Sequence, residues 1–180
     1  MITKKTSLPD KSILKTTESS FDYVDSFIGE FSDSDNKIGF LEIGRAFSKS
    51  KSKWISILMA LRDKIVKPFG LKISKKVTNK KSQNFEFEKG KQFGIFKVFD
   101  KTENEVILGE NDKHLDFRIS ILLDNQTENK KILTISSIVK FNNWFGKLYF
   151  MTIKPFHNII VPKMLKGILD KIEIEKTTNR

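Results

Sequence analysis

The residues best suited to chemistry lie in the stretch GENDKHLDFRISILLD, residues 109–124. His114, Asp116 and Arg118 are two positions apart there, and apolar residues separate them. Because successive side chains of a β-strand point to opposite faces, this spacing predicts a strand with all three on one face and leucine, phenylalanine and isoleucine on the other. The chemistry then depends on which face is turned toward the interior.

Two interpretations of this row are open. If it lines an apolar cavity, His114 or Asp116 is suited to act as a general base and Arg118 to hold a developing enolate, which is the chemistry of a cyclase, dehydratase or isomerase. If the apolar residues face the interior, the row is the solvated side of a strand, where Asp116 and Arg118 pair with each other or across strands.

Four ring-bearing side chains are further candidates for a ligand site. Trp54 heads the apolar stripe of a predicted helix, as core or as cavity wall, and Trp144 falls in a predicted hairpin turn that would cover the mouth of a pocket. Tyr149 lies on a predicted strand face from which its hydroxyl could enter a cavity. His157 falls in the first turn of the last predicted helix, either as a structural residue or as a ligand contact.

No pattern in the sequence indicates a metal or a cofactor. The chain has no cysteine and two histidines, whose spacing matches no known zinc motif. A triad of His114, Asp116 and His157 would require the strand to meet the start of the last helix. The phosphate loop, the dinucleotide-binding glycine motif, the serine-hydrolase elbow and the zincin motif are all missing. We therefore expect neither a metal nor a cofactor.

The formal charge of +11 invites a nucleic-acid function, but the kind of basic residue argues against specific recognition. Only four of the 33 basic residues are arginines, whereas recognition of bases and phosphates favours the arginine fork. The lysine excess fits the amino-acid bias of an AT-rich genome. The densest basic run, residues 72–83, is then a solvated loop or a contact for anions or a membrane surface. We expect nucleic-acid binding that is weak, independent of sequence and lost near physiological salt.

The hydrophobic pattern places these candidates on a mixed fold. Residues 1–20 show no period and are expected to form an N-terminal arm, followed by one domain over 21–176. An amphipathic helix is expected from Trp54 to Ile65, ended by Pro68 and Gly70, and a C-terminal helix over 155–174 that bends or restarts at Pro162. Strands are expected at 21–31, 93–100, 105–110, 114–124, 131–141 and 147–154.

Short polar connections make the strands an antiparallel meander, so the fold class is α+β, with a curved sheet of six or seven strands wrapped around the long C-terminal helix. One apolar stripe of that helix should be buried against the sheet. Its expected members are Ile159, Ile160, Met164, Leu165, Ile168, Leu169 and Ile172.

This order resembles the helix-grip fold of the START-like (SRPBCC) superfamily. More narrowly, the phrases WISILMALRDKIVKPFGLK, DKHLDFRIS, FNNWFGKLYF and IKPFHNIIVPKML resemble the bacterial family called domain of unknown function 2867, over roughly residues 21–170. The resemblance implies a helix-grip fold with no established activity. In some bacterial proteins a similar domain follows a short-chain-dehydrogenase-like domain, which implies an accessory, ligand-binding role. This sequence lacks such a domain.

The leading hypothesis is a helix-grip domain that binds a small apolar or amphipathic ligand between its sheet and its C-terminal helix. The alternatives are the enzyme that uses the His114, Asp116 and Arg118 row, and weak lysine-driven attachment to anionic surfaces. No signal peptide and no run of about 20 apolar residues is present, so we expect a cytoplasmic protein without a transmembrane segment. A homodimer is one assembly that the sequence permits.

Overall fold

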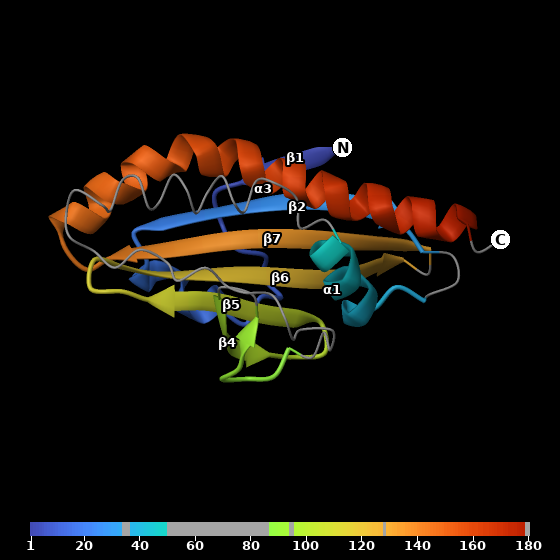
Figure 1. Ribbon diagram of the computed structural model, residues 1–180, viewed down its shortest axis with the longest axis horizontal. Helices are drawn as coiled ribbons and strands as arrows, with labels where there is room; N and C mark the ends of the chain where they lie inside the picture. Colours follow the sequence, from blue (N-terminus) through green and yellow to red (C-terminus); the bar gives the residue numbers. More distant parts are fainter. Residues whose placement is uncertain (34–36, 50–86, 94–95, 128, 179–180) are drawn as a thin grey trace.

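The protein folds as one antiparallel sheet with a long helix on one side (Figure 1). The computed structural model describes residues 1–33, 37–49, 87–93, 96–127 and 129–178. Within them the sheet has seven strands in the order β1-β2-β7-β6-β5-β4-β3. The strands are β1 (Ile2–Lys5), β2 (Tyr23–Ser32), β3 (Gln92–Phe93), β4 (Phe96–Lys101), β5 (Glu105–Asn111), β6 (Leu115–Thr127) and β7 (Lys130–Phe141). The helices are α1 (Phe40–Lys49), α3 (Trp144–Thr178) and the short 3-10 helix η1 (Lys15–Ser20).

This arrangement confirms the predicted α+β class and is consistent with a helix-grip fold. Figure 1 shows α3 running lengthwise along the sheet beside β2 and β7, with α1 near its C-terminal half. The expected helix around Trp54 and the basic run 72–83 lie outside the described residues.

The main core lies between the sheet and α3. Alternate residues of β2, β5, β6 and β7 point toward α3 and pack on its apolar stripe, as the period of two requires. The core includes Phe27, Phe31, Val106, Leu108, Ile121, Leu123, Leu133, Ile135, Met164, Leu165, Ile168 and Ile172. We call this side of the sheet the inner face. The predicted stripe is confirmed from Met164 onward, but Ile159 is exposed and does not belong to it.

The opposite side of the sheet, the outer face, is covered by the N-terminal segment, residues 6–20. Glu105 is buried on this face and accepts hydrogen bonds from Ser12 Oγ (2.6 Å) and from the backbone N–H of Ile13 (2.7 Å). The Ser120 hydroxyl also donates to it. These bonds offset the cost of burying a carboxylate and tie the segment to β5 and β6.

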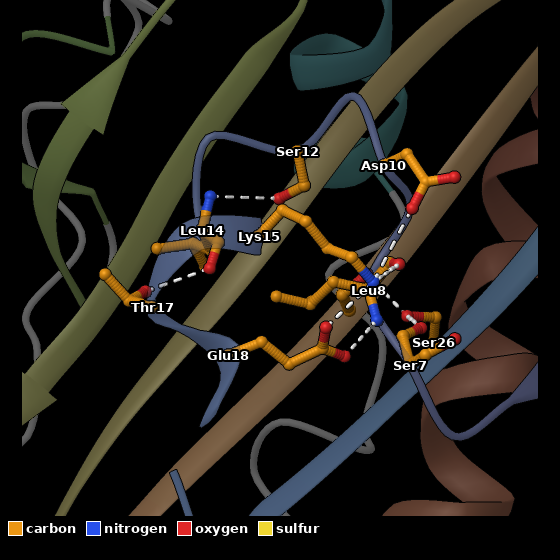
Figure 2. Close-up of polar contacts among 10 residues, drawn as sticks. Ser7, Leu8, Asp10, Ser12, Leu14, Lys15, Thr17, Glu18 and Ser26 are labelled. Carbon is orange, nitrogen blue, oxygen red and sulfur yellow. Dashed lines mark hydrogen bonds and ion pairs between the residues drawn. The ribbon is translucent and has the colours of Figure 1, made fainter. Parts of the chain in front are cut away.

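Further contacts hold the same segment in place (Figure 2). The Glu18 carboxylate accepts the backbone N–H of Leu8 at 2.7 Å and pairs with Lys15 at 2.8 Å. The Ser26 hydroxyl of β2 donates to the Ser7 carbonyl at 2.8 Å. The sequence predicted residues 1–20 as an arm lying on the surface. Residues 2–5 instead form an edge strand, and the residues after them pack as part of the domain.

Helix α3 begins earlier than the sequence predicted. Residues 147–154 were expected as a strand because they are aromatic and β-branched, and Trp144 was expected in a hairpin turn. Both predictions are wrong, because α3 is helical from Trp144 onward. The Asn143 side chain accepts the Gly146 N–H at 3.0 Å, the hydrogen bond of a helix N-cap, and this cap fixes the start of the helix.

The helix also continues through two prolines. The sequence predicted a bend or a restart at Pro162, but α3 is assigned as one helix through both Pro155 and Pro162. His157 therefore lies in the middle of this helix and not in its first turn.

Two glycines of α3 differ in their surroundings and give a matched test of how the helix is seated. A Cβ on Gly146 would lie 1.9 Å from the His114 carbonyl oxygen, whereas a Cβ on Gly167 would meet nothing within 4 Å. We expect Gly146→Ala to lower the free energy of unfolding by about 2–3 kcal/mol, because the start of α3 must move away from the β5–β6 turn. Gly167→Ala should raise it by about 0.5–1 kcal/mol through helix propensity.

Urea denaturation of both variants checks this expectation. Equal stabilisation by the two alanines would show that α3 does not rest on the β5–β6 turn.

Candidate functional site

Asp116 and Arg118 belong to the outer face of β6, and His114 precedes the strand in the β5–β6 turn. Ile121 and Leu123 of β6 pack in the core with α3, so the residues of opposite parity point outward. The three side chains do not converge on one point. Arg118 contacts β4 and β5, whereas His114 and Asp116 both contact the segment before α3.

Arg118 is bound within the outer surface. Its guanidinium lies 3.6 Å from the centre of the Phe99 ring and donates to Asn111 Oδ1 at 2.7 Å and to the Phe117 carbonyl at 2.8 Å. Partial burial lowers the pKa of Arg118, while the charges of Asp116 and Glu110 raise it. In the described part of the chain no ion pair joins Arg118 to Asp116, so the ion pair expected from their spacing does not form.

His114 and Asp116 connect the β5–β6 turn to the start of α3. His114 Nδ1 lies 3.1 Å from Asn143 Nδ2, and its ring centre lies 4.8 Å from that of Phe145. Asp116 accepts a hydrogen bond from Asn142 Nδ2 at 3.1 Å. These contacts support the solvated-strand interpretation, because both side chains have structural partners and neither faces the interior.

The inner face holds a different polar group, which we call the Asp25 cluster. Asp25 of β2 is buried, and its Oδ1 lies 3.2 Å from His157 Nε2 of α3. The Tyr23 hydroxyl donates to Asp25 Oδ2 at 2.6 Å, and Lys4 Nζ of β1 lies 3.5 Å from the same oxygen. Lys4 also donates to Asn158 Oδ1 at 2.5 Å. One carboxylate thus joins two strands to the middle of α3.

The charges in this cluster shift its titration. Burial acts to raise the pKa of Asp25, but the hydrogen bond and charge of His157, the Tyr23 hydroxyl and the charge of Lys4 outweigh it, so the pKa lies below its usual value. Burial, together with the hydrogen bond to Asp25, raises the pKa of Tyr23. The carboxylate is therefore ionised at neutral pH and Tyr23 keeps its proton.

The inner face beside this cluster is incompletely covered. Phe117 and Ile119 of β6 are partly exposed, although the next inward residues of the strand are buried. Ser137 of β7 pairs in register with both Ile119 and Asp25, so the three form one cross-strand row. Ser137 is buried, and its hydroxyl makes no hydrogen bond with a described residue.

The other predicted ligand residues divide between these regions. Tyr149 is partly buried on α3, where it packs near Leu115 and Phe150. Trp144 is largely exposed at the first turn of α3, and Trp54 lies outside the described residues. Of the predicted site residues, His157 is the one that the structure places in the Asp25 cluster. Among the described residues no three histidine or acidic side chains group as a metal site would require.

Sequence reasoning missed Asp25, Tyr23 and Lys4. A signal for the first two exists, because Tyr23, Asp25 and Phe27 alternate along the predicted first strand and so share a face. A charged residue between two inward aromatic residues indicates a buried, paired carboxylate. Lys4 had no such signal, because the segment around it shows no period.

Fold and site together define an α+β domain with a buried ionic cluster between its sheet and its long helix. The family model described as Protein of unknown function (DUF2867) matches residues 18–164, so the chain belongs to this family. No curated protein and no solved structure matches the chain. No helix in the described ranges is long and apolar enough to cross a membrane. The family description names no activity, and the function has to be argued from the site.

The lowered pKa of Asp25 predicts a pH-dependent contribution to stability. Because the folded-state pKa lies below the unfolded value of about 3.9, the contribution is fully present above about pH 5 and is lost as the pH falls through the folded-state pKa. Asp25→Asn should lower the free energy of unfolding by about 1–3 kcal/mol at neutral pH. The difference from the wild type should shrink below about pH 4.

Urea denaturation of both proteins across the acid range measures this difference. A difference that stays constant from neutral pH to below about pH 3 would show that the charge of Asp25 contributes nothing to stability.

Arg118 gives a separate prediction about the outer face. Arg118→Ala should lower the free energy of unfolding by about 1–2 kcal/mol, because the contact with Phe99 and the hydrogen bond to Asn111 are both lost. Asp116→Asn should change it by less than about 0.5 kcal/mol, because no ion pair is broken. Equal losses in the two variants, measured by thermal unfolding, would indicate that the pair forms in solution.

Proposed function

We propose that this domain binds a small amphipathic ligand between the inner face of the sheet and α3, next to the Asp25 cluster. The observation that carries the proposal is the row of Asp25, Ser137 and Ile119. It places a hydroxyl that has no hydrogen-bond partner among the described residues between a paired carboxylate and a partly exposed apolar side chain, on the side of the sheet that α3 covers. Small-molecule sites combine apolar walls with a few polar groups in this way.

The neighbouring residues suggest how a ligand would lie. Phe117 and Ile119 offer apolar surface to its hydrocarbon or aromatic part. The Ser137 hydroxyl can both donate and accept, and His157 is partly exposed while it stays bonded to Asp25. A polar group of the ligand would therefore meet these two side chains, and the buried Asp25 would hold the His157 ring in its orientation.

We further propose that the protein is a cytoplasmic member of the START-like superfamily, with binding as its main activity. The order of strands and the long C-terminal helix support the superfamily assignment. The superfamily assignment rests on the sequence resemblance and on the fold, and the ligand experiment below depends on neither assignment.

A second candidate is an isomerase or dehydratase that uses the same cluster. The Asp25–His157 hydrogen bond favours this candidate. In many enzymes a carboxylate orients a partly exposed histidine that acts as the general base. The enzyme first expected from the sequence required the His114, Asp116 and Arg118 row to face inward. That row lies on the outer face, and Asp25 and His157 replace it in this proposal.

The two histidines provide a matched test of ligand binding, because each makes one side-chain hydrogen bond on a different face. Fatty acids and aromatic acids should raise the melting temperature of the wild type and of His114→Gln. His157→Gln should bind the same ligand about tenfold more weakly, the loss of about 1.4 kcal/mol expected when one hydrogen bond to the ligand is lost. Ser137→Leu should abolish the shift, because the added side chain fills the row beside Ile119.

Native mass spectrometry of protein purified from cells would identify a bound ligand directly. Recovery of the ligand unchanged supports the binding module, and its conversion by wild type but not by His157→Gln supports the enzyme. Equal loss of binding in His114→Gln and His157→Gln would contradict a site on the inner face.

A further inference from the structure

The outward side of α3 carries a group of exposed apolar residues that neither the core nor the Asp25 cluster uses. Their exposed fractions range from 43% for Phe156 to 75% for Trp144. The group, which we call the α3 apolar face, contains Trp144, Leu148, Met151, Phe156 and Ile159. All but Phe156 follow one another at spacings of four, three and eight residues. They therefore lie along one side of the helix over about 22 Å.

The exposure is concentrated in the first half of the helix. The second half turns Lys163, Lys166, Asp170 and Glu173 to solvent, the usual outward side of a helix that packs on a sheet. Ile174 is the one large apolar residue exposed there within the described part. The contrast within a single helix shows that apolar exposure is not a general property of α3.

Lysines accompany the α3 apolar face, and acidic residues do not. Lys147 lies beside it and Lys163 follows its last residue, and both are exposed, whereas the Lys154 ammonium lies 4.9 Å from the centre of the Tyr23 ring of β2. Asp170 is the first acidic residue of α3, so the helix from Trp144 to Ile168 carries no negative charge. No ion pair with a described residue neutralises Lys147 or Lys163. Apolar side chains next to unpaired lysines are complementary to a surface that is apolar in depth and anionic at its boundary.

We propose that the α3 apolar face docks on a membrane surface that contains anionic lipid. The apolar side chains would enter the boundary between headgroups and acyl chains, and Lys147 and Lys163 would contact lipid phosphates. The helix would lie in the plane of the membrane while its opposite side stays packed on the sheet. Trp144, at one end of the face, fits the preference of tryptophan for this boundary. This proposal does not depend on the ligand site of the inner face.

Co-sedimentation with vesicles tests the proposal on the full chain. The probes are vesicles of equal parts phosphatidylcholine and phosphatidylglycerol, and vesicles of phosphatidylcholine alone. The mixed vesicles should bind the wild type at least tenfold more tightly, with a further loss as salt rises from about 0.1 M to about 0.5 M. The emission of Trp144 should shift to shorter wavelength on binding, and Trp144→Phe should remove that shift while binding persists.

Matched variants separate this face from general charge. Leu148→Ser with Met151→Ser should weaken binding about tenfold, whereas Leu41→Ser, at an exposed apolar residue of α1, should not. The double variant Lys147→Glu with Lys163→Glu should also weaken binding about tenfold. Its control, Lys101→Glu with Lys130→Glu, changes the net charge equally elsewhere and should leave most binding intact. Circular dichroism confirms that each variant is folded before it is compared.

Several results would overturn the proposal. One is equal binding to the two kinds of vesicle, and another is an equal loss in the Lys101/Lys130 and Lys147/Lys163 pairs. Binding to a DNA duplex in the absence of vesicle binding would assign the lysines to a nucleic acid and would also overturn it. Loss of vesicle binding together with unchanged ligand-induced melting shifts would support a docking face separate from the ligand site.

Discussion

The burial of Asp25 constrains how the rest of the domain is assembled. A carboxylate between a sheet and a helix loses its hydration and stays ionised only when several donors replace the water. Those donors come from three elements: Lys4 of β1, Tyr23 of β2 and His157 of α3. A shift of α3 by one turn, about 5.4 Å, would leave the carboxylate without its helical partner. The ionic contact thus selects one position of α3, where apolar packing alone is less specific.

The same requirement explains the outer face. Glu105 is buried there, and Ser12, Ser120 and the N–H of Ile13 satisfy it. A sheet that is covered on both faces carries polar residues on both, so alternation along a strand does not tell which side is the interior. This is why the row on β6 could be interpreted as a site. The residues that bind the N-terminal segment and those that face α3 alternate in the same way along a strand. Only their neighbours in the folded chain show which face each residue belongs to.

The sequence predicted the elements with strong local signals. Period-two patterns found the central strands and their antiparallel order, and the stripe from Met164 to Ile172 found the helix that covers them. The start of α3 was missed because the aromatic and β-branched residues of 147–154 favour a strand, whereas the cap at Asn143 fixes the start of a helix. The Asp25 cluster was largely missed because His157 lies 132 residues after Asp25, and only the folded chain brings Lys4, Asp25 and His157 together.

The sheet order also determines how the protein reaches this structure. Strands β4 to β7 pair with their neighbours in sequence, but β2 pairs with β7, so that Tyr23 lies opposite Val139. Closing so long a loop costs more chain entropy than forming a hairpin, and contacts of this kind are made late in folding. On a ribosome β2 has only the short edge strand β1 as a partner until β7 has emerged, and until α3 follows Asp25 lacks His157. The folding rate should therefore be limited by the docking of β2 and not by the meander.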